Sequence, residues 1–349
     1  MAKRILVVIV CAALALSAGC SRPDEAGKQA EDDAAKPAAK GSRVLRAYSA
    51  LDPNETKIYF RAYEEQTGVR IQWVRMSSGA VMARVTAERK NPTMGLWFGG
   101  PSTDFIHAAK QGLLEPFKPE IDFELPPNAH DPGWHWSGFY FGAIGFVSNT
   151  NIMKKRGLTP PTSWQDLIRP EFKGEIGVAY PYTSGTAYTF LAAIVQMMGE
   201  EAGLEYLKKL DRNVHHYNKS GSACVTQVGL GEIGVGISFS HDIMKKGVSK
   251  GYPVALSFPK EGTGYEIGGM ALIKGGPDHE EARKFIEWVL SVEAQSMLKN
   301  WFRIPLHPEA EIAEGAVRAE DVKLIEFDEV KAGEDKERLV EEWRLITAQ

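Results

Sequence analysis

Strand-like and helix-like patterns of apolar residues follow one another along the chain from about residue 44. Short apolar segments typical of strands precede segments in which apolar residues lie three and four positions apart, as on the buried face of a helix. The first units are a strand over 44–50, a helix from Asp52 to Gly68, a strand over 69–74 and a helix over 80–90. A further strand is predicted over 96–100. This alternation predicts an α/β fold with mostly parallel sheets.

The same alternation returns in the second half of the chain. Strands are predicted over 174–180, 232–239, 253–258 and 265–274, and helices over 188–198 and 202–210. The clearest amphipathic pattern covers 280–300, where Ala282, Phe285, Ile286 and Val289 lie at helical spacing. We therefore predict one long helix over this range.

The first twenty residues have a different pattern. A short basic start precedes an unbroken apolar stretch over 5–16, and small residues then lead to Cys20. The stretch is shorter than the ~20 residues that span a bilayer, and it is typical of a signal peptide. Ser17-Ala18-Gly19-Cys20 resembles the lipobox of bacterial lipoproteins. We expect residues 1–19 to be a signal peptide and Cys20 to carry a lipid, with an ordinary secretory signal as the alternative.

Residues 21–42 contain no aromatic residue, no β-branched residue, and neither Leu nor Met. Such a segment buries too little apolar surface to offset the entropy lost on ordering. Residues 20–42 are therefore predicted to be a flexible, lipidated tether, and the folded body is predicted to begin near Val44.

Composition and charge narrow the function classes. Apolar residues make up 44% of the chain and charged residues 25%, as in ordinary globular proteins, and the formal net charge is -4. A nucleic-acid partner is disfavoured because such proteins usually carry a basic excess. Cys11, Cys20 and Cys224 are too scattered for a zinc or iron–sulfur site. A secreted hydrolase and a structural lipoprotein without a ligand remain as alternatives from other classes.

Four segments, in this order, resemble the type II periplasmic solute-binding proteins of ABC importers. They are Tyr59 to Val69 around Gln66-Thr67-Gly68, Pro161-Thr162-Ser163-Trp164-Gln165-Asp166-Leu167 with Lys173-Gly174, the glycine-rich 228–239, and Phe285 to Gln295. The resemblance covers about residues 44–308. It points to the extracellular solute-binding family that includes ferric-iron, thiamine, aminoethylphosphonate and sugar-phosphate binders, and it is closest to the sugar-phosphate-binding branch.

This resemblance implies two α/β lobes, each a mixed, mostly parallel sheet flanked by helices, with a cleft between them. Residues 43–140 with about 265–300 would form lobe 1, residues 141–264 lobe 2, and residues 301–349 a C-terminal helical segment packed on both. The ranges 141–148 and 265–273 would cross between the lobes. It also implies a monomer without enzymatic activity or cofactor, in the periplasm or cell envelope, that delivers a small anionic solute to an inner-membrane ABC permease.

Four loops rich in Ser, Thr and Gly are candidates for holding a phosphate or phosphonate. Each follows a strand or precedes a helix, and helix N-termini present free backbone N–H groups and a dipole that favours anions. The alternative is that these residues only cap helices. The candidate residues are Ser77, Ser78, Gly79, Gly100, Ser102, Thr183, Ser184, Gly185, Thr186, Ser220 and Ser222.

His241-Asp242 resembles the adjacent His and Asp with which the sugar-phosphate branch holds sugar hydroxyls. Glu266 stands where that branch has a Glu, with Glu261 as the alternative. The ferric-binding branch instead has two adjacent tyrosines after the glycine-rich strand, and this chain has none there. We therefore expect a phosphorylated sugar or a similar phosphate ester, with ferric iron or a ferric chelate as the alternative solute. Trp97 and Tyr182 are candidates for an apolar platform beneath it.

The lipid anchor predicts the behaviour of one substitution. Cys20→Ser removes the thiol that would be lipidated, and the protein is then expected to leave the membrane fraction for the aqueous fraction on detergent phase partitioning. Continued partitioning of Cys20→Ser with membranes would contradict the predicted anchor.

Overall fold

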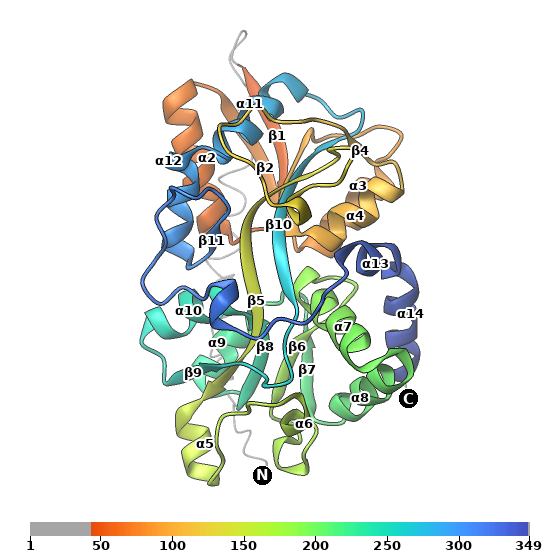
Figure 1. The fold of residues 1–349 in the computed structure, drawn as a ribbon, viewed down its shortest axis with the longest axis vertical. Helices are drawn as coiled ribbons and strands as arrows, with labels where there is room; N and C mark the ends of the chain where they lie inside the picture. Colours follow the sequence, from red (N-terminus) through yellow and green to blue (C-terminus); the bar gives the residue numbers. More distant parts are fainter. Residues whose placement is uncertain (1–42, 348–349) are drawn as a thin grey trace, which may run out of the picture. The chain divides into compact units, whose positions relative to one another are not determined.

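Strands β5 (Ser137–Asn149) and β10 (Tyr265–Ile273) run antiparallel through the middle of the computed structural model, which describes residues 43–347 (Figure 1). The first part of β5 pairs with β10, and its last part, from Ile144, pairs with β8 (Val235–Phe239) and β9 (Val254–Ser257). One long strand therefore belongs to two sheets. The predicted signal peptide, Cys20 and the predicted tether lie outside the described residues.

The strand order is β2-β1-β3-β10-β5-β8-β6-β7, with β4 beside β10 and both β9 and β11 beside β5. The remaining strands are β1 (Val44–Ser49), β2 (Arg70–Arg75), β3 (Leu96–Pro101), β4 (Leu114–Glu115), β6 (Ile176–Ala179), β7 (Val214–Asn218) and β11 (Ile304–Pro305). The β1–β2, β1–β3, β6–β7 and β6–β8 pairs are parallel, and every pair that includes β5 or β10 is antiparallel. The predicted α/β class with mixed sheets is confirmed.

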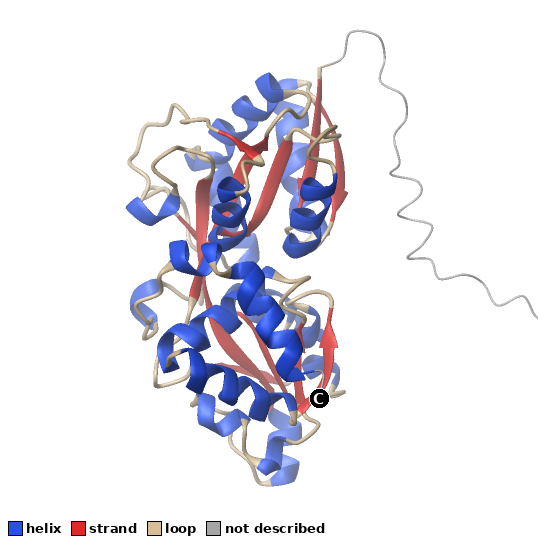
Figure 2. Cartoon of the chain, turned by 90° about the vertical axis from the view of Figure 1, so that its right-hand side faces the viewer, coloured by secondary structure: helices blue, strands red, loops and turns tan. Residues whose placement is uncertain are grey.

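Helices lie on both faces of these sheets (Figure 2). They are α2 (Pro53–Thr67), α3 (Ser78–Ala87), α4 (Ser102–Lys110), α5 (Thr150–Arg156), α6 (Trp164–Leu167), α7 (Gly185–Met198), α8 (Glu200–Asp211), α9 (Ala223–Leu230), α10 (Ser240–Lys246), α11 (His279–Val289), α12 (Val292–Ser296), α13 (Glu329–Glu334) and α14 (Lys336–Thr347). Helix α2 begins where predicted because the Asp52 side chain accepts a hydrogen bond from Asn54 N, and it ends at Gly68.

Two large hydrophobic cores divide the body into two lobes. We call first lobe the part built on β1–β4 with α2–α4, α11 and α12, and second lobe the part built on β6–β9 with α5–α10. In the first core, Phe285 meets the rings of Phe60, Tyr63 and Phe98 at centroid distances of 5.1–5.4 Å. In the second core, Trp164 packs edge-on against Phe146 at 4.8 Å. Each lobe thus has its own buried aromatic centre.

Two predicted elements differ from the structure. The single helix expected over 280–300 is divided into α11, α12 and a 3₁₀ turn over Met297–Trp301. The division falls at Ser291, because its side chain accepts a hydrogen bond from Ala294 N and starts a new helix. The strand expected from 232 begins only at Val235, after a turn that follows helix α9.

The C-terminal segment contacts both lobes. Helix α13 packs against α4 of the first lobe, and α14 packs against α7 and α8 of the second. The buried Lys336 ammonium pairs with Asp104 on α4 and lies 4.5 Å from the Tyr188 ring centroid on α7. Within residues 43–347, no helix has both the length and the apolar character needed to cross a membrane.

The first core predicts a large difference between two truncations. Phe285→Ala empties a fully buried ring position, and we expect a loss of about 3–5 kcal/mol in the free energy of unfolding. Leu345→Ala is the control, because that side chain is 57% exposed and its loss is expected to change stability by less than about 0.5 kcal/mol. Urea titration of both variants measures the difference, and similar losses would contradict the assigned core.

Candidate functional site

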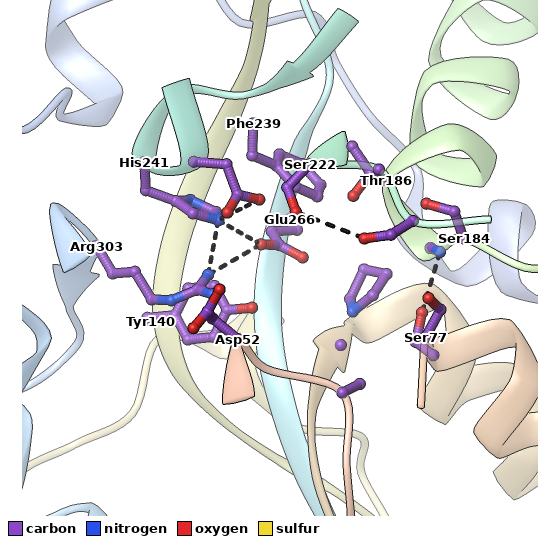
Figure 3. Close-up of a pocket in the computed structure, with 18 of the residues that line it drawn as sticks. Asp52, Ser77, Tyr140, Ser184, Thr186, Ser222, Phe239, His241, Glu266 and Arg303 are labelled. Carbon is purple, nitrogen blue, oxygen red and sulfur yellow. Dashed lines mark hydrogen bonds and ion pairs between the residues drawn. The ribbon is translucent and has the colours of Figure 1, made fainter. Parts of the chain in front are cut away.

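A pocket lies between the two lobes, beside β5 and β10 (Figure 3). It encloses about 490 Å³ of space not filled by atoms, part of it open to solvent. Its lining is mostly polar and comes from Ala50, Asp52, Arg75, Ser77, Ser78, Gly100, Pro101, Tyr140, Ser184, Gly185, Thr186, Ser220, Gly221, Ser222, Phe239, His241, Asp242, Lys246, Glu266 and Arg303.

One end of the pocket, which we call the hydroxyl end, collects Ser and Thr side chains at the starts of helices. Ser78 begins α3, Ser184 and Thr186 lie at the start of α7, and Ser222 precedes α9. The Ser184 hydroxyl accepts a hydrogen bond from Ala187 N, so its proton is free to be donated to another oxygen. The Thr186 hydroxyl has no hydrogen-bond partner within residues 43–347. This end therefore offers several donors to an anion.

The two lobes touch at the hydroxyl end. Gly185 N of the second lobe donates to Ser78 Oγ of the first at 3.0 Å, and Gly79 N donates to Thr183 O at 3.1 Å. A Cβ atom on Gly185 would lie only 2.5 Å from Pro101 Cγ, so this close approach requires glycine. The two lobes are therefore in direct contact at this end of the pocket.

The opposite end, which we call the charged end, is formed by His241, Glu266 and Arg303 (Figure 3). Asp242, the residue after His241, also lines the pocket there. His241 Nε2 lies 3.6 Å from Glu266 Oε1 and 3.7 Å from Asp242 Oδ2. Arg303 Nη1 lies 2.7 Å from His241 Nε2, and its guanidinium stacks 4.0 Å from the Tyr140 ring centroid. Helix α10, strand β10 and the segment before β11 thus bring together residues far apart in sequence.

Lys246 connects the two ends of the pocket. Its ammonium donates to Ser222 Oγ at 2.7 Å and pairs with Asp52 Oδ2 at 3.0 Å, which links the second lobe to the first. The Lys246 charge lowers the pKa of Asp52 although burial acts to raise it. Asp52 therefore remains ionised at neutral pH and holds Lys246 in place.

The protonation of the charged end follows from its burial. Burial raises the pKa of Glu266 to about 8, although Arg303 opposes the rise. Burial and the Arg303 charge together lower the pKa of His241 well below its ordinary value. A largely protonated carboxyl group can both donate a hydrogen bond to a hydroxyl group and accept one from it. Among residues 43–347 no group of three His, Cys, Asp or Glu could hold a metal ion.

Most of the predicted solute-binding residues line this one pocket. They are Ser77, Ser78, Gly100, Ser184, Gly185, Thr186, Ser220, Ser222, His241, Asp242 and Glu266. Gly79, Ser102 and Thr183 do not line it. The Ser102 hydroxyl donates to Glu329 of the C-terminal segment, and the Thr183 hydroxyl donates to Tyr180 O in its own turn. The Gly79 N–H is used in the contact between the lobes.

Other predicted candidates lie elsewhere. Glu261 accepts hydrogen bonds from Ser163 and from Trp164 N, outside the pocket. Trp97 is completely buried in the first core. Tyr182 stacks on Tyr180, away from the pocket lining. These side chains serve packing or capping, so Glu266 rather than Glu261 faces His241.

Sequence reasoning missed the basic residues of the pocket and Tyr140. Arg303 had one local signal, because it is the only charge in the apolar run from Trp301 to Leu306. Lys246 and Arg75 had no such local signal, since each lies among alternating polar and apolar residues of an ordinary helix or strand. Asp52 was interpreted only as a helix cap, which it is, but its second oxygen also binds Lys246.

Known proteins share this architecture. The family model described as bacterial extracellular solute-binding protein matches residues 102–332. The periplasmic binding protein AfuA from Actinobacillus pleuropneumoniae, solved with exogenous fructose-6-phosphate bound, is 33% identical with a TM-score of 0.85, covering 88% of this chain and 99% of that one. The periplasmic binding protein P5PA is 31% identical with a TM-score of 0.83, covering 87% and 99%. A Haemophilus influenzae protein is 36% identical over 295 residues, covering 81% of this chain and 84% of its own.

The raised pKa of Glu266 predicts a pH dependence of stability. Its carboxyl titrates near 4.3 in the unfolded chain and at about 8 in the folded protein, so the folded state binds more protons between these values. Glu266 therefore makes the fold less stable as pH rises through this window, by up to about 1.4 kcal/mol per pH unit. Glu266→Gln should remove this part of the slope when unfolding is measured from pH 4.5 to pH 8. An unchanged slope would show that Glu266 is ionised throughout.

Proposed function

The chain belongs to the family of bacterial extracellular solute-binding proteins, the non-enzymatic transport components that serve ABC importers, and from this premise we propose that its solute is a phosphorylated sugar or a similar phosphate ester. The pocket between the lobes is the proposed capture site. The single observation that carries the proposal is the division of this pocket into a hydroxyl end and a charged end.

The phosphate group is assigned to the hydroxyl end. The starts of α3, α7 and α9 converge there, and the dipole of a helix start favours an anion. Gly79 N, Gly185 N and Ala187 N are already bonded within the protein, so the donors left there are mainly side-chain hydroxyls. Thr186 adds a free hydroxyl, and Ser184 adds the proton of a second. Lys246, bonded to Ser222 at 2.7 Å, supplies a positive charge beside them. Together these donors match the oxygens of a phosphate monoester.

The sugar hydroxyls are assigned to the charged end. Asp242 supplies acceptors, Glu266 supplies a carboxyl group held largely protonated by burial, and Arg303 supplies donors, while His241 Nε2 already accepts from Arg303. A ring with several hydroxyls can both donate to and accept from such a set. The relative solved with fructose-6-phosphate bound, at 33% identity, supports this class of solute.

The cellular location is proposed from the N-terminal sequence and from membership of the family. A lipid on Cys20 would hold the body at a membrane of the cell envelope, with residues 21–42 as its tether. From there the protein would deliver its solute as a monomer to an ABC permease in the inner membrane. The relatives named above include periplasmic binding proteins, which supports this compartment.

A thermal-shift titration tests the proposed solute class. A ligand that binds only the folded state stabilises it by ~2.7 kcal/mol at 100 times its dissociation constant. Fructose 6-phosphate is expected to raise the melting temperature of the protein, whereas fructose and ferric citrate are expected to leave it unchanged. A rise with ferric citrate alone would contradict the proposal and favour the ferric alternative.

The hydroxyl end predicts a contrast between two threonines in the same turn. Thr186→Ala removes a hydroxyl that faces the pocket, and a hydrogen bond to a charged group contributes about 1.5–3 kcal/mol. We expect the Kd for fructose 6-phosphate, measured by calorimetry, to rise by roughly 10- to 100-fold. Thr183→Ala is the matched control, because its hydroxyl donates to Tyr180 O and does not line the pocket. Equal effects of the two substitutions on the Kd would contradict the assignment of the phosphate group to the hydroxyl end.

A further inference from the structure

We infer that the buried pair Glu55–Arg303 is a positioning pair that holds His241 as a neutral hydrogen-bond acceptor. Because Glu55 neutralises Arg303, this guanidinium brings no free positive charge to the charged end. The site therefore selects solutes whose phosphate is their only anionic group. The selectivity rests on the proposed function. The state of His241 is a property of the unliganded protein and can be tested separately.

Glu55 is fully buried on α2 and does not line the pocket, yet it contacts Arg303 with both carboxylate oxygens. Arg303 Nε donates to Oε1 at 2.8 Å and Nη2 donates to Oε2 at 3.0 Å. This bidentate geometry fixes the plane of the guanidinium, and Tyr140 stacks on that plane. Phe302, the residue before Arg303, has φ 57°, a left-handed conformation that turns the chain into the site.

The fixed guanidinium leaves Nη1 to reach across to the second lobe, where it meets His241 Nε2 at 2.7 Å. A guanidinium can only donate hydrogen bonds, so His241 Nε2 must accept and cannot carry a proton. The proton of the neutral imidazole is therefore on Nδ1. That atom is buried against Gly142 of β5, where a Cβ would lie only 2.4 Å from it, and it has no hydrogen-bond partner among residues 43–347. Arg303 thus determines the tautomer of His241.

The groups around His241 agree with this assignment. They are Asp242 and Lys246 on α10, Glu266 on β10, Tyr140 on β5, and Arg303 just before β11. The two acidic groups lie 3.6 and 3.7 Å from Nε2, beyond a direct hydrogen bond, whereas Arg303 is within one. Burial and the positive charges of Arg303 and Lys246 lower the pKa of His241. The imidazole therefore stays neutral although two carboxyl groups lie nearby.

Two of the three cations of the pocket, Arg303 and Lys246, are paired with carboxylates. Glu55 neutralises Arg303, and Asp52 pairs with Lys246, which also lies 3.8 Å from Asp242. Arg75 donates to Leu51 O, and its charge interacts with Asp52 and Asp242. A second anionic group on a solute would therefore meet Asp242 and the neutralised guanidinium at the charged end. Like charges placed side by side cost binding free energy, so the site should reject sugar acids and bisphosphates.

The first test is a nitrogen NMR spectrum of unliganded, histidine-labelled protein, with the His241 signals assigned by their loss in His241→Gln. At about pH 6, where an ordinary histidine is largely protonated, His241 should show an unprotonated Nε2 and a protonated Nδ1. In Glu55→Gln, which weakens the two contacts that fix the guanidinium, the tautomer of His241 should become mixed without gaining a second proton. An unchanged tautomer in Glu55→Gln would show that Glu55 does not position Arg303. A doubly protonated His241 in the wild-type protein would overturn the positioning role.

The second test compares two solutes, fructose 6-phosphate and 6-phosphogluconate, in wild-type protein and in Glu55→Gln. The wild-type protein should bind 6-phosphogluconate at least about tenfold more weakly than fructose 6-phosphate. Glu55→Gln frees one positive charge at the charged end and should reduce the ratio of the two dissociation constants by about tenfold. Glu175→Gln is the control, because it removes a carboxylate paired with Arg156 in the second lobe, outside the pocket.

The outcomes separate the two claims. An equal loss of affinity for both solutes in Glu55→Gln would mean that the pair only stabilises the fold, and would overturn the selectivity. Failure of the wild type to bind either compound would contradict the proposed function. In that event the NMR result alone decides the role of Glu55 and Arg303 at His241.

Discussion

The antiparallel pairing of β5 with β10 is the constraint on which the rest of the structure depends. β5 has thirteen residues and leaves β10 at about Ala143, after which it pairs with β8 and β9. Because one strand serves two sheets, the two lobes have separate cores but a shared backbone. The pocket lies beside this shared strand, where Tyr140, Gly142 and Glu266 approach residues from both lobes. The site is therefore formed by the architecture, with no single loop containing it.

Burial at this junction explains the chemistry of the pocket. A charge removed from water must be paired or neutralised, and each buried group here follows one of these routes. Arg303 and Glu55 pair, Glu266 takes a proton as its pKa rises to about 8, and His241 gives one up. The result is a set of hydrogen-bonding groups with little net charge at one end, and helix starts with the hydroxyls of Ser184 and Thr186 at the other. A molecule with hydroxyls at one end and phosphate at the other fits both.

Local signals predicted much of this from the sequence. The Asp52 cap and the Ser/Thr/Gly loops are short patterns whose chemistry can be recognised without a fold, whereas the expected role of His241-Asp242 came from the resemblance to the sugar-phosphate branch. The Glu55–Arg303 pair could not be predicted, because its members are 248 positions apart and meet only through the sheet order. Gly79, Ser102 and Thr183 carried the same loop signal as the pocket residues, yet their polar groups contact other parts of the protein. The division of the helix at Ser291 was missed because apolar spacing continues across it.

The orientation of the bound solute tests the account most directly. We would determine the crystal structure of the protein with fructose 6-phosphate. The account predicts the phosphate at the starts of α3 and α7, within hydrogen-bond distance of Thr186, and the sugar hydroxyls against His241, Asp242 and Glu266. A phosphate placed against Arg303 and His241, or a sugar bound outside the pocket, would contradict it.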